Sequence, residues 1–249
     1  MAKLLSFEFR KLFRQKSFYI CLGIALFMGV VTLRTFSKNS FSSYDVLVSL
    51  VKAYGNCSLT MLFGIFAAIY VCDDYSAGTI RNIVTRGYTR TNIYLAKLIT
   101  LCFAAVIMLL TCWIVSAFAG VAFFGSGTSA FSASFIESMA AQFMLFMAYA
   151  CVFNAVCSAL QKTGISVAVC IILPLAVTMI LTFIQITFAD KGGALSNANL
   201  QQYWLDDLVN AVSWVDADKA SLDLAFKAAP LYIIGSMALG WLSIARREY

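Results

Sequence analysis

The chain has 249 residues, of which 61% are apolar and 12% are charged, and its mean hydropathy is +0.85. Because soluble globular domains carry about 25% charged residues, this composition disfavours cytosolic enzymes, secreted disulfide-rich proteins and disordered chains. A membrane-spanning helix needs about 20 apolar residues. The composition therefore predicts an all-α integral membrane protein in which residues 1–249 form one transmembrane domain.

The sequence contains no histidine, which is the commonest general base and the commonest metal ligand. We therefore expect no catalytic residue, no metal site and no cofactor bound by this chain. Of the eight cysteines, all but Cys57 lie within or at the end of apolar runs, where a free thiol behaves as a small hydrophobic group. A disulfide or metal site is the less favoured interpretation, since no C-x-x-C spacing occurs.

Residues 1–16 predict an amphipathic helix at the inner membrane interface. Apolar side chains recur there at helical spacing, as at Leu5, Phe9 and Leu12, and basic side chains cluster beside them. Cations in such a helix attract anionic lipid head groups at about 1 kcal/mol each. The alternative is an ordinary basic flank without a defined helix. The cations that we expect at the membrane surface are Arg10, Lys11 and Arg14.

Uncharged apolar runs predict six transmembrane helices. With the amino terminus in the cytoplasm, twelve Lys and Arg residues fall on the inner side and six on the outer side. Inner loops carry an excess of Lys and Arg, so we expect both termini to be cytoplasmic. The basic residues flank the spans and form no continuous patch, which disfavours a nucleic-acid partner. The predicted spans are residues 17–35, 53–72, 94–124, 137–160, 163–189 and 228–245.

Residues 73–93, between the second and third predicted spans, indicate a short capped helix on the cytoplasmic side. Asp74 or Ser76 is a suitable N-cap, and Gly87 can end the helix in a left-handed conformation. Ile80, Ile83 and Val84 share one face of this helix. An apolar stripe facing the cytosol needs the membrane surface or a protein partner to cover it.

This segment resembles the cytoplasmic loop of ABC type-2 permeases, the six-span membrane subunits of one class of ATP-binding-cassette exporters. The similar run is DYSAGTIRNIVTRGYTRTNIYLAKLI, and the basic, leucine-rich residues 1–16 are also similar to that family. Two positions depart from the family pattern: Asp74 replaces the more usual Glu, and Gly87 stands where many members have Pro. The motif positions are Asp74, Gly78, Thr79, Thr89, Arg90 and Lys97.

The resemblance implies that residues 73–93 form a coupling helix that docks on a cytoplasmic ABC ATPase. No G-x-x-x-x-G-K-[ST] phosphate loop occurs in the sequence, so ATP and Mg²⁺ are expected on that separate partner chain. A second copy or a related permease is the other implied protein partner, in a bacterial cell membrane. The residues that we expect to dock are Asp74, Gly78, Thr79, Ile80, Arg81, Ile83, Arg86 and Arg90.

Few polar residues fall inside the predicted spans. Asn154 and Gln185 are candidates for a substrate path, and interhelical hydrogen bonds are the alternative role. Pro174 predicts a bend near Val169 or Cys170, because proline removes a hydrogen bond within a helix.

The last outer loop, residues 190–227, contains a second amphipathic pattern. Leu200, Trp204, Leu208, Val212 and Val215 recur at helical spacing, and Asp206, Asp207 and Asn210 fall on the opposite side. We expect an amphipathic helix at the outer interface, either as a gate or as an ordinary surface-lying helix.

Together these features predict a permease subunit that exports an amphipathic substrate such as a peptide, drug or lipid. The alternative is a membrane scaffold or binding subunit without a transport cycle. ATPase activity that rises on adding a substrate would distinguish the two, because a scaffold predicts no such stimulation.

Overall fold

The computed structural model describes residues 1–36, 57–124, 133–189, 200–213 and 219–245. Every regular element within these ranges is helical, as predicted. The helices are α1 (Ala2–Arg14), α2 (Lys16–Phe36), α4 (Cys57–Ser76), α5 (Thr79–Thr85), α6 (Arg90–Phe124), α7 (Ala133–Leu160), α8 (Thr163–Ala189), the 3-10 helix η1 (Leu200–Tyr203), α9 (Leu205–Ser213) and α10 (Lys219–Ala245).

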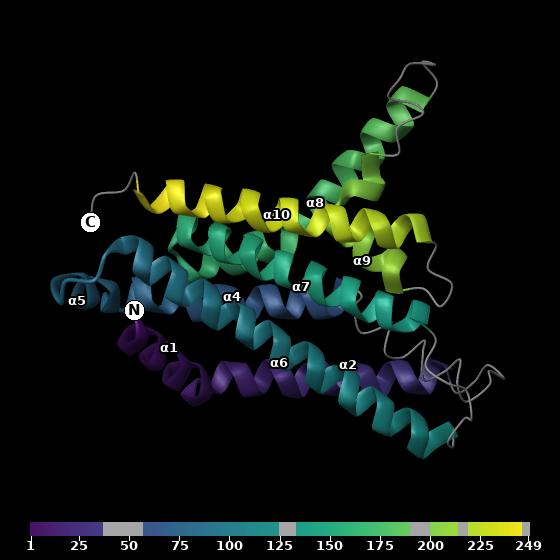
Figure 1. Cartoon of the computed structure of the whole chain (residues 1–249), viewed down its shortest axis with the longest axis horizontal. Coiled ribbons are helices and arrows are strands. Elements are labelled where there is room, and N and C mark those ends of the chain that lie inside the picture. Colours follow the sequence, from purple (N-terminus) through teal and green to yellow (C-terminus); the bar gives the residue numbers. More distant parts are fainter. Residues whose placement is uncertain (37–56, 125–132, 190–199, 214–218, 246–249) are drawn as a thin grey trace.

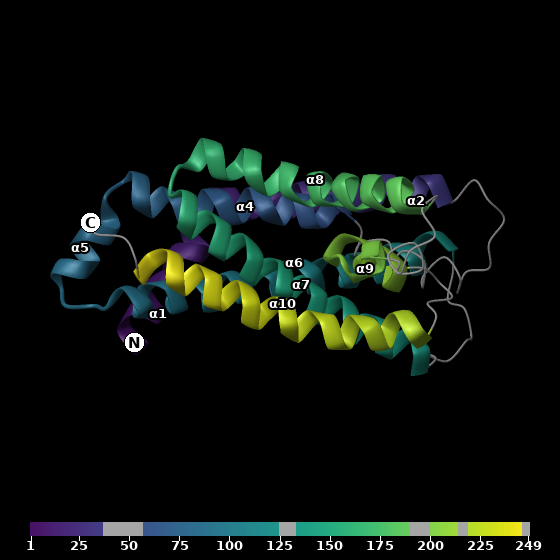
Figure 2. The same ribbon diagram turned by 90° about the horizontal axis from the view of Figure 1, so that it is seen from above.

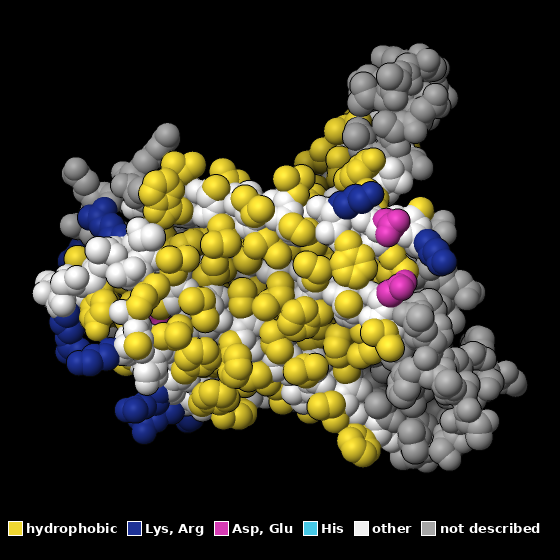
Figure 3. Space-filling view, in the orientation of Figure 1, with side chains coloured by type: hydrophobic (Ala, Val, Ile, Leu, Met, Phe, Trp, Pro, Cys, Tyr) yellow, Lys and Arg dark blue, Asp and Glu magenta, His cyan; other side chains and the backbone are white. Residues whose placement is uncertain are grey.

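The long helices lie side by side in a bundle with two different ends (Figure 1, Figure 2). The start of α1, the short helix α5 and the end of α10 lie at one end, and α9 lies toward the other. In the space-filling view, a broad apolar surface separates basic side chains at the α5 end from acidic and basic side chains that lie together at the opposite end (Figure 3). Such an apolar band is what the hydrocarbon core of a bilayer requires.

Five of the described helices are long and apolar enough to cross a membrane: Leu59–Ser76, Arg90–Val115, Ile136–Leu160, Thr163–Thr187 and Lys219–Ile244. The first predicted span, 17–35, corresponds to α2. The apolar stretch of α2 among the residues searched, Lys16–Phe27, is shorter than a span. Six spans and the orientation of the chain therefore stay predictions. The last span begins earlier than expected, because α10 already starts at Lys219.

Aromatic packing joins α4 to α7 in the centre of the bundle. The Phe63 ring lies 5.2 Å from the Phe146 ring and 6.3 Å from the Phe153 ring, measured between centroids. Gly64 permits this approach, because a Cβ atom there would lie 3.1 Å from the Phe153 ring. Small residues at helix interfaces in membranes act in this way, since packing drives helix association where lipid is as apolar as the side chains.

Helix α8 is the least covered of the long helices. Pro174 lies inside it, and Figure 1 shows its later part directed away from α10. Met179 and Phe183 in that part are 75% and 71% exposed. The missing hydrogen bond at proline is the physical reason for expecting a bend here.

The outer amphipathic segment is split into η1 and α9, with Trp204 between them. Helix α9 packs into the bundle, because its side chains Leu205, Leu208 and Val212 are buried in the main core. The expectation that Asp206 faces away from this apolar side is wrong. Asp206 is 6% exposed, and its Oδ1 accepts a hydrogen bond from the Tyr149 hydroxyl at 3.2 Å. Val215 lies outside the described residues.

A close contact between α10 and α6 gives a first testable prediction. A Cβ atom at Gly240 would lie 2.2 Å from the Tyr94 hydroxyl and 2.7 Å from its Cζ, and Tyr94 is only 2% exposed. We expect Gly240→Ala to lower stability by about 1–3 kcal/mol through overpacking. Gly235→Ala on the same helix is the control, since nothing lies within 4 Å of that position. Thermal unfolding in detergent micelles should separate the two variants, and equal midpoints would contradict the contact.

Candidate coupling site

The amino-terminal segment is helical, which excludes the alternative of a flank without a defined helix. Helix α1 packs on the bundle through one face, on which Leu4, Glu8 and Leu12 are buried. The Phe9 ring meets the Phe103 ring of α6 edge to face, with centroids 4.9 Å apart. Helix α1 is therefore a packed part of the bundle, in addition to any contact that it makes with lipid.

Helices α1, α4 and α6 meet around four charged side chains, of which three are buried and one is half-buried. Asp74, near the end of α4, forms ion pairs with Lys11 of α1, at 2.5 Å, and with Lys97 of α6. Lys97 also lies 3.7 Å from Glu8 of α1. Glu8, Asp74 and Lys97 are each less than 5% exposed. We call these four residues, Glu8, Lys11, Asp74 and Lys97, the buried charge cluster.

Tyr70 completes the polar contacts of the buried charge cluster. Its hydroxyl donates to Glu8 Oε2 at 2.7 Å, and the Lys11 ammonium lies 4.7 Å from the centre of its ring. Two anions and two cations balance in this site. Buried charges are tolerated when they are paired and hydrogen-bonded, and the loss of one partner leaves an uncompensated charge.

Lys11 illustrates the electrostatics at the edge of the cluster. Burial and the neighbouring charge of Lys97 lower the pKa of Lys11, while Asp74 and Glu8 oppose this change. Of the three cations expected at the membrane surface, Arg10 and Arg14 are exposed, whereas Lys11 turns inward to Asp74. The two carboxylates therefore favour the charged form of Lys11 and oppose the effect of its burial.

The loop after α4 forms the short helix α5, as predicted, but its start differs from the prediction. Neither Asp74 nor Ser76 is its N-cap: both belong to α4, and Gly78 precedes α5 with φ of 67° and no side-chain cap hydrogen bond. A left-handed φ is costly for residues with a Cβ atom, which explains glycine at this position. Gly87 follows α5 with φ of 86°, which confirms the predicted left-handed residue.

The apolar face of α5 has a partner within the chain. Ile80 and Ile83 are 6% and 8% exposed and cluster with Leu4 of α1 and with Ile93 and Ala96 of α6. The expectation that this stripe needs the membrane surface or another protein is therefore wrong for these two residues. Thr79 and Arg90 are half-buried at the two ends of the loop. The exposed side chains in α5 and at its C-cap are Arg81, Asn82, Thr85 and Arg86.

The structure thus divides five of the eight expected docking residues into two groups, while Gly78, Thr79 and Arg90 are half-buried. Asp74, Ile80 and Ile83 face inward and hold α5 to the bundle, whereas Arg81 and Arg86 face outward. Glu8, Tyr70 and Lys97 were not among the expected site residues. Glu8 had a signal in the sequence: it lies four positions from both Leu4 and Leu12 and so shares their apolar face.

The candidate substrate-path residues lie apart from each other. Asn154 of α7 is fully buried beside the Tyr94 hydroxyl of α6. Gln185 is half-buried on α8, and it has a polar interaction of its own. A groove of about 850 Å³ is bounded by α7, η1 and α10, and neither residue lines it.

Comparison with known proteins identifies the family of this chain. A family model described as ABC-2 family transporter protein matches residues 4–189, well over half of the chain. This range contains most of α1, the whole of α5 and the whole buried charge cluster. A search among curated proteins gives no match. Members of the family are generally non-catalytic membrane subunits that pair with ATPase subunits. The chain therefore belongs to the ABC-2 transporter family, as a multi-pass membrane permease component.

Proposed function

We propose that this chain is the permease subunit of an ATP-binding-cassette exporter and that α5 is its coupling helix. The observation that carries the proposal is the arrangement of α5: its inner face is packed on α1 and α6, and its outer face presents Arg81, Asn82 and Arg86 to a partner. The partner is a cytoplasmic ATPase, which holds the ATP and Mg²⁺ that this chain has no phosphate loop to bind.

The packing of α5 suggests how movement reaches the spans. A push on the outer face of α5 is borne by Ile80 and Ile83, which contact Leu4 of α1 and Ile93 of α6. Asp74, near the end of α4, joins this helix to α1 through Lys11 and to α6 through Lys97. These segments therefore move as one unit. A preference of the docked ATPase of a few kcal/mol for one arrangement is enough to shift the population of permease states.

The proposed cargo is an amphipathic molecule such as a peptide, drug or lipid. The apolar band seen in Figure 3 suits a path for such molecules, which bind apolar surfaces and carry a polar end. We also propose that two permease subunits, either two copies of this chain or one copy and a related permease, pair in a bacterial cell membrane.

Charge reversal on α5 tests the proposal directly. We expect the double variant Arg81→Glu/Arg86→Glu to reduce co-purification of the ATPase at least tenfold, because complementary charges direct docking. The control is Arg10→Glu/Arg14→Glu, which reverses two exposed cations of α1 at the same end of the bundle. The control should retain the ATPase. Equal retention by both variants, or an ATPase whose activity does not respond to any amphipathic substrate, would contradict the proposal.

A further inference from the structure

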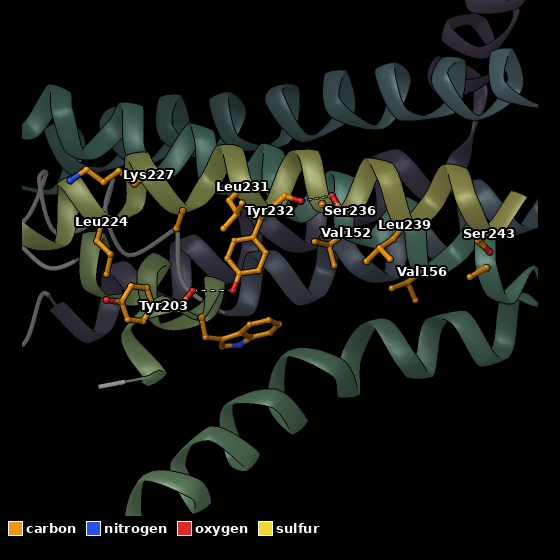
Figure 4. A pocket seen from close by; sticks show the side chains of 15 residues that line it. Val152, Val156, Tyr203, Leu224, Lys227, Leu231, Tyr232, Ser236, Leu239 and Ser243 are labelled. Atoms are coloured by element: carbon orange, nitrogen blue, oxygen red, sulfur yellow. Dashed lines mark hydrogen bonds between the residues drawn. The ribbon is translucent and has the colours of Figure 1, made fainter. Parts of the chain in front are cut away.

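A groove of about 850 Å³ runs along α10 where this helix meets α7 and η1 (Figure 4). This volume lies within the range of about 300–1,000 Å³ that is usual for ligand sites. Its walls are mainly apolar, with Val152 and Val156 from α7 and Leu231 and Leu239 from α10. Leu231 and Leu239 are 73% and 68% exposed, so the groove opens onto the apolar outer surface of the bundle.

One end of the groove differs chemically from the rest. Lys227, Leu224 and Tyr203 lie at this end, and Ser243 lies at the other (Figure 4). Lys227 is the one charged side chain among the described residues that line the groove. No carboxylate of a described residue forms an ion pair with it. A cation at the end of an apolar groove complements an amphiphile with a negative head group.

Aromatic residues place the same end at the depth of lipid head groups. The Tyr232 hydroxyl donates to the Tyr203 carbonyl oxygen at 3.0 Å, and the Trp204 ring meets the Tyr232 ring edge to face, with centroids 6.2 Å apart. Tyr and Trp are enriched at membrane–water interfaces, where their amphipathic rings lie at the level of the head groups. These contacts also attach η1 and Trp204 to α10.

We propose that this groove binds one acyl chain of an anionic membrane phospholipid, whose phosphate is held by Lys227. The apolar walls accept the chain, and the aromatic end sets the depth at which the head group meets the lysine. The site lies outside α5 and the buried charge cluster, and the proposal holds whether or not the protein completes a transport cycle.

Trp204 provides a probe for the site. A variant in which Trp113, Trp214 and Trp241 are replaced by Phe keeps Trp204 as its single tryptophan, and brominated acyl chains quench a tryptophan that they contact. In nanodiscs, we expect brominated phosphatidylglycerol to occupy the site roughly fivefold more strongly than brominated phosphatidylcholine, the preference that one lysine near a head group provides. Lys227→Gln should remove the preference. Lys219→Gln is the control, because Lys219 is exposed on the same helix but does not line the groove.

A steric block tests the acyl-chain position independently. Nothing lies within 4 Å of the Cβ position of Gly235, which lines the groove, so Gly235→Leu fills open space and should reduce quenching by both lipids. Gly23→Leu is the matched control, since Gly23 on α2 is equally open and does not line the groove. The proposal is overturned if Gly235→Leu leaves quenching unchanged or if Lys219→Gln reduces the lipid preference as much as Lys227→Gln. It is also overturned if Cys placed at 235 cross-links to a second copy, because a subunit contact then fills the groove.

Discussion

Replacing Asp74 by Asn is expected to lower the free energy of unfolding by about 3–5 kcal/mol, the usual cost of removing one partner from a buried ion pair. Asp74 is the carboxylate that pairs with both lysines of the buried charge cluster, and the Lys97 side chain is only 1% exposed. The asparagine keeps the shape of the side chain but leaves a net positive charge in the site. Reversible unfolding in mixed detergent micelles measures the loss, and protease sensitivity of α1 reports whether that helix has detached.

A double substitution tests whether loss of charge balance causes the destabilisation expected for Asp74→Asn. Asp74→Asn/Lys97→Met removes one anion and one cation, so Glu8 and Lys11 remain as a balanced pair. We expect the double variant to be more stable than the sum of the two single losses predicts, by about 1–3 kcal/mol, the range found for directly coupled residues. Additive losses would mean that Asp74 and Lys97 contribute independently, contrary to the contacts described above.

Ile83→Asp is expected to detach α5 from the bundle. The substitution places a carboxylate where Ile83 packs with Leu4 and Ile93 at 8% exposure. Loss of the apolar side chain alone costs about 2–5 kcal/mol at a buried site, and an unpaired buried charge adds to that cost. We expect trypsin to cleave after Arg81 and Arg86 at least tenfold faster than in the unchanged protein. We also expect the detached helix to bind less ATPase.

Asn82→Asp is the matched control for this experiment. It introduces the same charge at the neighbouring position, but Asn82 is exposed. Trypsin cleavage in this variant should stay close to that of the unchanged protein. If Asn82→Asp exposed the two arginines as strongly as Ile83→Asp does, the packing of Ile83 would not be what holds α5 in place.

Most helix positions could be predicted from the sequence because lipid permits few alternatives. Backbone polar groups within a bilayer must be bonded within a helix, so uncharged runs such as 163–189 mark helices directly, and α8 has the predicted bounds. The end of α5 was also predictable, because Gly87 is a local signal that depends only on its own backbone. The start of α5 was not predictable. Asp74 is a good N-cap by residue type, but its carboxylate pairs with Lys11 and Lys97.

The buried charge cluster could not be predicted from the sequence, because its members are distant from one another along the chain. Lys11 and Asp74 are separated by 63 positions, and Lys97 follows Asp74 by 23. Periodicity indicates which residues of one helix share a face, but it does not say which face of another helix they meet. Asp206 shows the same limit, since a charge on α9 was assigned to the polar side although Tyr149 of α7 provides a buried partner.

During synthesis, α1 leaves the ribosome before any of its ionic partners exists. Glu8 and Lys11 have their final contacts only after Asp74 and Lys97 have been made, so the first helix of the chain is among the last to settle. A nascent chain that stops before Lys97 lacks one of the residues that fix α1 to the bundle. Docking of α1 thus requires that α4 and α6 have both been inserted correctly. A protease that recognises an undocked α1 would therefore degrade copies in which the first three long helices have failed to assemble.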